Sequence, residues 1–182
     1  NQIALSLASL TFMFAMGLSV TAMIRIGNQK GLNDYVTLRK VAISIFLLAI
    51  VIEIVFALLF VALHTTLPYI FVDINDVTNL TENLEVIAIS ANLLLVAAVF
   101  QISDGLQVVV LGALRGLQDA KIPMYITFVA YWVIGFPISI YLGLETELKA
   151  IGVWIGLLAG LTAAAIFLYI RFNYLTKKLI KN

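Results

Sequence analysis

The stretch VFQISDGLQVVVLGALRG, residues 99–116, places a carboxylate, Asp104, inside a segment made mostly of Val, Leu and Ala. Gln107 follows close to one helical turn later, and Arg115 stands eleven residues after the acid. At about 1.5 Å of rise per helical residue, this spacing corresponds to about 16 Å. If the segment is a helix in lipid, Asp104 is predicted to lie near the middle of the bilayer, far from water.

The composition makes lipid the expected solvent. Hydrophobic residues make up 63% of the 182 residues and charged residues 12%, and the mean hydropathy is +1.08. Soluble domains are about 45–50% apolar and about 25% charged. The net charge of +1 says nothing about nucleic acid, but the chain has no basic run that could follow phosphates, so we expect no nucleic-acid partner. The chain has no Cys and a single His, His64, which excludes thiolate sites, a Cys nucleophile and a His-based metal cluster or triad.

Five apolar stretches are long enough to cross a bilayer, which takes about 20 residues. We therefore expect an all-α membrane protein with five transmembrane helices in one domain. The third stretch is longer than needed and is predicted to tilt or to extend past the membrane. Pro137, preceded by Gly135, is expected to kink the fourth. The predicted spans are roughly 3–26, 41–63, 84–114, 122–143 and 150–171.

The polar turns between these spans alternate between basic and acidic. Of the eleven basic residues, ten fall in the first turn, the third turn or the C-terminal tail, and only Lys149 falls elsewhere. The positive-inside rule then places the N-terminus outside and the C-terminus in the cytoplasm, in a plasma membrane such as the bacterial inner membrane. Because an outside N-terminus here comes without a targeting signal, we expect a further part of the protein upstream.

A charged side chain at the predicted depth of Asp104 costs about 2.5–3.5 kcal/mol on insertion scales. Protonation of the acid, a bound cation or a structural partner in the bundle would each offset this cost. On a helix, Phe100 and Gln107 lie near the face of Asp104, and Gln107 is able to bond to the carboxylate or to a ligand. Because acids inside membranes are usually functional, an ion or transport site is the favoured interpretation and a structural Asp the alternative.

Glu53 is a second acid at mid-depth, thirteen residues after Lys40 and eleven before His64. The sequence around it, AIVIEIVFALL, contains no other polar residue that could form a hydrogen bond with it. Two interpretations remain open for Glu53. It is either a second proton-titrating acid or a partner for Ser and Thr side chains on neighbouring helices.

Arg25 and Arg115 close the first and third spans. They are expected to anchor the topology by reaching to the interface. The alternative is a gating ion pair with Asp34 or Asp119.

Four segments together resemble the multidrug and toxic compound extrusion (MATE) family, in its NorM-like branch. FQISDGLQVVVLGALRGLQD resembles the tenth helix of that family, and NQIALSLASLTFMFAMGLSVTAMIRIGNQKG resembles its eighth helix and the following turn. YWVIGFPISIYLG and GVWIGLLAG resemble its eleventh and twelfth helices. The resemblance covers nearly the whole chain in the right order. It implies helices eight to twelve of a twelve-helix, two-lobe transporter, that is, the C-terminal lobe without its seventh helix.

The resemblance also implies a function and site residues. The family exports cationic or amphipathic compounds by alternating access, in exchange for Na⁺ or H⁺ and without other cofactors. Asp104 matches the acid that binds the coupling cation, a possible Na⁺ site, and its partner in the family is a Glu on the seventh helix. Phe100 stands where some members have a Tyr, and Gln2 matches a cavity Gln placed to meet substrate. Asp73 and Asp76 fall on an outer loop that contacts drug in some members. The implied partners are these small molecules, the lipid bilayer and the N-terminal lobe.

Two other functions remain open at this point. A flippase of lipid-linked oligosaccharide would have a related fold, but it would carry basic residues in its cavity, and none lies in mid-span here. A membrane scaffold or accessory subunit would use its acids only structurally. A membrane enzyme fits least, since the chain has neither a His pair nor a Cys.

Overall fold

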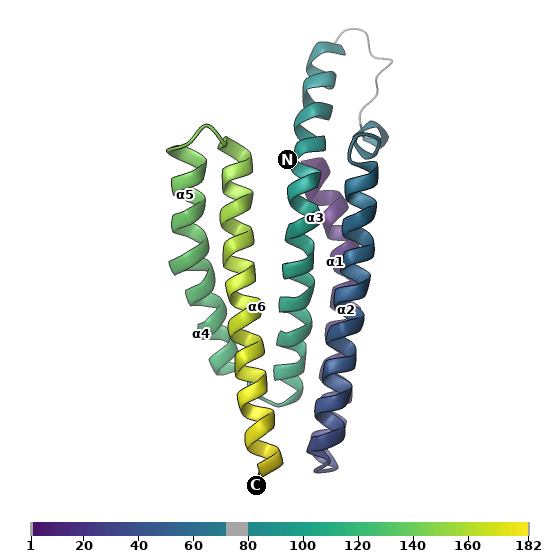
Figure 1. The fold of residues 1–182 in the computed structure, drawn as a ribbon, viewed down its shortest axis with the longest axis vertical. Coiled ribbons are helices and arrows are strands. Elements are labelled where there is room, and N and C mark those ends of the chain that lie inside the picture. Colours follow the sequence, from purple (N-terminus) through teal and green to yellow (C-terminus); the bar gives the residue numbers. More distant parts are fainter. Residues whose placement is uncertain (1, 72–79, 182) are drawn as a thin grey trace.

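The computed structural model describes residues 2–71 and 80–181, with the side chains of all of these except residues 80–82 and 85. This part of the chain is a bundle of long helices with no strand (Figure 1). Five helical segments are long and apolar enough to cross a membrane, as predicted. The helices are α1 (Gln2–Gly31), α2 (Tyr35–Leu63), the 3₁₀-helix η1 (Leu67–Ile70), α3 (Leu80–Gly116), α4 (Lys121–Val129), the π-helix η3 (Ala130–Gly135), α5 (Phe136–Leu144) and α6 (Lys149–Lys181).

The fourth span changes its helix type midway. Helices α4 and α5 are joined by the π-helical segment η3, where the N–H of Phe136 donates to the carbonyl of Tyr131, five residues back. Pro137 lies in the first turn of α5. Proline has no N–H to bond to the carbonyl four residues before it. Where the sequence predicts a kink at Pro137, the structure shows a wider π turn just before the proline.

Helix α3 lies at the centre of the bundle, between α6 on one side and α1 and α2 on the other (Figure 1). The α4–α5 segment packs mainly against α6. Glycines allow these close approaches: Gly156 of α6 lies directly on Ser139, and a Cβ at Gly160 would lie 3.1 Å from the Cα of Gly135. The glycine spacing in α6 therefore serves packing within the bundle.

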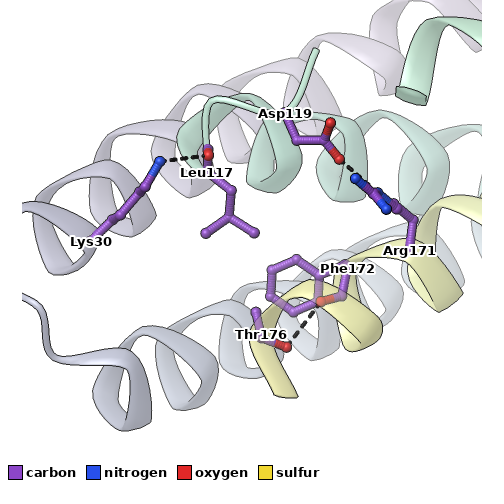
Figure 2. Close-up of polar contacts among 6 residues, drawn as sticks. All are labelled: Lys30, Leu117, Asp119, Arg171, Phe172 and Thr176. Atoms are coloured by element: carbon purple, nitrogen blue, oxygen red, sulfur yellow. Dashed lines mark hydrogen bonds and ion pairs between the residues drawn. The ribbon is translucent and has the colours of Figure 1, made fainter. Parts of the chain in front are cut away.

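One end of the bundle is held together by basic side chains (Figure 2). Lys30 of α1 donates to the carbonyl of Leu117 at 2.8 Å, and Arg171 of α6 forms an ion pair with Asp119 at 2.8 Å. These contacts join the α1–α2 turn region, the α3–α4 turn and the end of α6. The three basic segments that were predicted to share one side of the membrane thus lie at one end of the fold (Figure 1).

The same end contains a helix cap. Asp34 is the N-cap of α2 and accepts a hydrogen bond from the backbone N–H of Thr37 at 3.0 Å. Hydrogen bonds from the side chain and the backbone of Thr37 hold the pKa of Asp34 below its usual value. The suggested ion pairs of Arg25 or Arg115 with Asp34 or Asp119 do not form in the described part of the chain, because Asp34 caps a helix and Asp119 pairs with Arg171.

Candidate functional site

Two apolar clusters fill the bundle, one above the other, and a layer of polar side chains separates them. On α2, the cluster near the basic end stops at Ala49 and the other starts at Ala57. On α3, the buried members of the two clusters stop at Ala98 and start again at Val109. We call the side chains between the clusters the polar layer: Thr11, Glu53, Gln101, Ser103, Asp104, Gln107, Tyr131 and Thr162.

Hydrogen bonds within the polar layer connect α3 to three other helices. The hydroxyl of Thr11 on α1 donates to Oε1 of Gln101 at 2.9 Å. The hydroxyl of Tyr131 in η3 donates to Oε1 of Gln107 at 2.7 Å. On α6, the hydroxyl of Thr162 shares a hydrogen bond of 2.9 Å with that of Ser103. Buried polar groups need such partners, so in this arrangement the bonds set how the helices are rotated about their axes.

Asp104 lies in this layer without a fixed partner. Its side chain is half-buried, and its carboxylate has no hydrogen bond or ion pair within residues 2–71 and 80–181. With about 3.6 residues per turn, Asp104 falls between the face of α3 that meets α1 at Gln101 and the face that meets η3 at Gln107. The Asp104 side chain therefore lies on the side of α3 between these two contacts. A mid-depth carboxylate with no fixed counterpart suits a ligand that comes and goes.

The acid on α2 is more deeply buried. Glu53 is 2% exposed, and its carboxyl group lies on the backbone of Gly105, the residue after Asp104. A Cβ at Gly105 would lie 2.6 Å from Oε1 of Glu53. Oε2 of Glu53 has no hydrogen-bond partner in the described part of the chain. The Ser or Thr partner suggested by the sequence is therefore not found at this oxygen.

The other predicted site residues have different surroundings. Gln107 is buried, but its hydrogen bond is to Tyr131 and not to Asp104. Phe100 packs edge-on against Trp154 of α6, with ring centroids 5.4 Å apart. Gln2 is exposed at the start of α1. Asp73 and Asp76 lie outside the described residues.

Sequence reasoning missed Gln101, Tyr131 and Thr11. Gln101 stands three residues before Asp104, and two amides flanking one acid at helical spacing is a signal that was available. Tyr131 and Thr11 lie far from Asp104 in the sequence, and only the packing of their helices brings them into the layer. No group of three or more His, Cys, Asp or Glu that could hold a metal ion occurs in the portion the structure describes. Ligands for Na⁺ at Asp104 would include neutral oxygens.

A multi-span helix bundle with a polar layer and a partner-free acid at mid-depth defines a multi-pass membrane protein built around a polar site within the membrane. The model of the MatE family matches residues 1–141, and this chain belongs to that family. It is similar to proteins named "Probable multidrug resistance protein NorM". The one from Rhodopseudomonas palustris is 40% identical over 177 residues, which is 97% of this chain and 36% of the relative. The one from Agrobacterium fabrum is 37% identical over 181 residues, 100% of this chain and 38% of the relative.

The fold also matches a solved structure. The eukaryotic MATE transporter AtDTX14 aligns with a TM-score of 0.83 at 20% identity, over 98% of this chain and 39% of that one. At this level of identity the match supports the fold alone. The chain spans little more than a third of the length of these relatives.

Proposed function

We propose that this chain forms part of the C-terminal lobe of an exporter of cationic or amphipathic compounds, driven by exchange for Na⁺ or H⁺. The names of its relatives support drug efflux as the activity, and a transporter rather than an enzyme. The observation that carries the proposal is the Asp104 carboxylate, which lies at mid-depth in the polar layer without a fixed partner.

In this proposal, Asp104 binds the coupling cation and thereby links cation binding to drug release. Ionised, the acid attracts Na⁺, a proton or a cationic drug. Once a cation neutralises it, the attraction for the drug is lost. Coupling requires that drug and cation favour different arrangements of the lobes, so that each binds more weakly when the other is present. An acid held by a permanent ion pair would not be free to make this exchange.

The distribution of polar groups favours drug export over a flippase. In the described part of the chain, the basic side chains lie near the helix ends, and the polar layer contains two acids and no base. An anionic lipid-linked oligosaccharide would meet repulsion at such a layer. We place the basic end of the bundle, with the C-terminus, in the cytoplasm of the bacterial inner membrane, and the N-terminus outside. The N-terminal lobe would supply the other half of the cavity.

Ethidium efflux by cells that express the full-length protein tests this function. Asp104→Asn should abolish efflux at normal expression, since the amide is nearly the same size but cannot take up a proton or neutralise a cation. Asp34→Asn is the matched control, because Asn caps helices about as well as Asp and Asp34 lies outside the layer. Dependence of wild-type efflux on Na⁺ would assign the ion as Na⁺, and its independence would assign H⁺. Full efflux by Asp104→Asn would make Asp104 a structural residue and overturn the proposal.

A further inference from the structure

Two atoms of the polar layer are buried without partners, and they are chemically complementary. Oε2 of Glu53 and Nε2 of Gln101 make no hydrogen bond in the described part of the chain, although their side chains are only 2% and 3% exposed. An amide nitrogen is a donor and a carboxylate oxygen an acceptor. Leaving both unsatisfied in a buried site is unfavourable, and native proteins rarely do so.

The two side chains lie on one face of α3. The carboxyl group of Glu53 covers Gly105, and Gln101 is located four residues before Gly105, so that one helical turn separates them on the same side of the helix. A Cβ at position 105 would lie 2.6–2.7 Å from three side-chain atoms of Glu53, so a larger residue there would displace the Glu53 carboxyl group. The close contact between α2 and α3 thus brings an unpaired acceptor next to the turn that carries the unpaired donor.

Thr11, the hydrogen-bond partner of Gln101 in this structure, has a second acceptor within reach of its hydroxyl. The hydroxyl of Thr11 lies 2.9 Å from Oε1 of Gln101 and also 2.9 Å from the carbonyl oxygen of Ala8. A hydroxyl group has one proton, so Thr11 cannot donate fully to both acceptors. When Thr11 donates to the carbonyl of Ala8, the hydrogen bond between Gln101 and α1 is broken, but the hydroxyl of Thr11 still has an acceptor. Release of Gln101 from α1 therefore leaves only its own Oε1 without a partner, a loss that a new hydrogen bond from Nε2 to Glu53 would offset.

We propose that Gln101 is a positioning residue with two alternative partners, Thr11 on α1 and Glu53 on α2, and that this exchange moves α3 at Asp104 during transport. On the helical wheel, Gln101 lies between Gly105 and Asp104. A rotation or shift of α3 that brings the amide to Glu53 therefore turns Asp104 relative to the contacts that α3 makes with α1 and η3. The inference rests on the proposed function, because it assigns the device that changes the access of the coupling acid.

Transport kinetics of the full-length protein in proteoliposomes test the exchange, with ethidium as substrate. Glu53→Leu and Gln101→Leu should each lower the maximal rate about tenfold, the size of effect expected when one state of an equilibrium loses a buried hydrogen bond. The KM for ethidium should change little. Glu53→Gln keeps an acceptor oxygen and should stay near wild type.

Two combined variants separate the pairing from a general structural effect. The exchanged pair Glu53→Gln with Gln101→Glu retains one donor and one acceptor, and it should recover the rate to within about twofold of wild type. The double variant Glu53→Leu with Gln101→Leu should be no slower than the slower single variant. Normal transport by Glu53→Leu, no recovery in the exchanged pair, or multiplied losses in the double variant would each overturn the proposal.

A distance measurement distinguishes failure of this inference from failure of the proposed function. Spin labels at Lys40 on α2 and Arg115 on α3, both exposed near the basic end, should give two distances in the wild type. Glu53→Leu should leave only one, and Glu53→Gln should keep both. This result does not depend on whether Asp104 couples transport to a cation. A single distance in the wild type, with and without ethidium, would contradict the exchange even if Asp104→Asn abolishes efflux.

Discussion

Gly116→Ala should destabilise the contact between α1 and α3 by an amount that follows from the backbone geometry. A Cβ at Gly116 would lie 2.6 Å from the carbonyl oxygen of Met23, and 3.2 Å from both the nitrogen of Gly27 and the Cβ of Ile26. None of these atoms is the flexible end of a side chain. The carbonyl oxygen must retreat to at least 3.4 Å to reach ordinary contact, and it can do so only if the helices separate.

Two opposing free-energy terms set the expected magnitude. Overpacking of this kind costs about 1–3 kcal/mol. We expect a cost in the upper half of this range, about 2–3 kcal/mol, because the backbone itself must move. Alanine regains up to about 1 kcal/mol of helix propensity over glycine. The free energy of unfolding should therefore fall by about 1–2 kcal/mol. Gly17→Ala is the matched control on α1, since nothing lies within 4 Å of a Cβ there, and it should be neutral or stabilising.

Unfolding of the full-length protein in mixed micelles, titrated with sodium dodecyl sulfate and followed by far-ultraviolet circular dichroism, measures the two variants side by side. The difference in unfolding free energy between the two variants should be about 1–3 kcal/mol, with Gly116→Ala less stable than wild type and Gly17→Ala unchanged or more stable. Equal stability of the two variants would refute the argument that α1 and α3 touch through their backbones at Gly116.

Three further predictions concern single polar contacts. Asp119→Asn should remove the ion pair with Arg171 and lower stability by no more than about 1 kcal/mol, because both partners are partly exposed. Proteolysis of the α3–α4 turn should become faster. An unchanged cleavage rate would count against a stabilising role of this ion pair. Tyr131→Phe should leave Gln107 without its hydrogen bond and lower stability by about 1–3 kcal/mol in the same micelle titration, whereas an unchanged midpoint would show that the bond contributes nothing. Asp34 has a pKa below the ordinary 3.8, so its capping contribution is fully present above pH 4 and is lost as the pH falls through the lowered pKa. Acid titration of stability should therefore be shallower in Asp34→Asn than in the wild type, and identical curves would argue against a capping role of the charge.

The five spans could be predicted from the sequence because each depends on one local property, the length of an apolar run. The bounds could not, because apolarity marks only the part in lipid. Helix α6 runs to Lys181, well past the predicted end at residue 171, because Leu and Ile continue the helical pattern between its lysines. The type of irregularity in the fourth span was also out of reach, since a proline predicts a missing hydrogen bond and not how the backbone adapts to it.

The candidate site was predictable as a single residue but not as a layer. Asp104 stood out because one acid in an apolar helix is a strong local signal. The partner of Gln107 could not be predicted, because it depends on how the fourth span is rotated when it packs. In the structure this partner is Tyr131, whose hydroxyl donates to Gln107. The surroundings of Glu53 show the same limit, since the feature that accommodates it is a glycine on another helix.

The polar layer also constrains how the protein is made. Each span carries only a few of its polar groups, so every one stays apolar enough for insertion, with mean hydropathies of 1.7–3.1. The penalty for Asp104, about 2.5–3.5 kcal/mol at mid-depth, is met by surrounding Leu, Ile and Val residues that each favour insertion by about 0.3–0.6 kcal/mol. Individual helices can therefore enter the bilayer before any hydrogen bond of the layer exists, and the layer forms only when inserted helices associate. Errors in this region should appear as late assembly defects, in chains that have crossed the membrane correctly but have not yet joined.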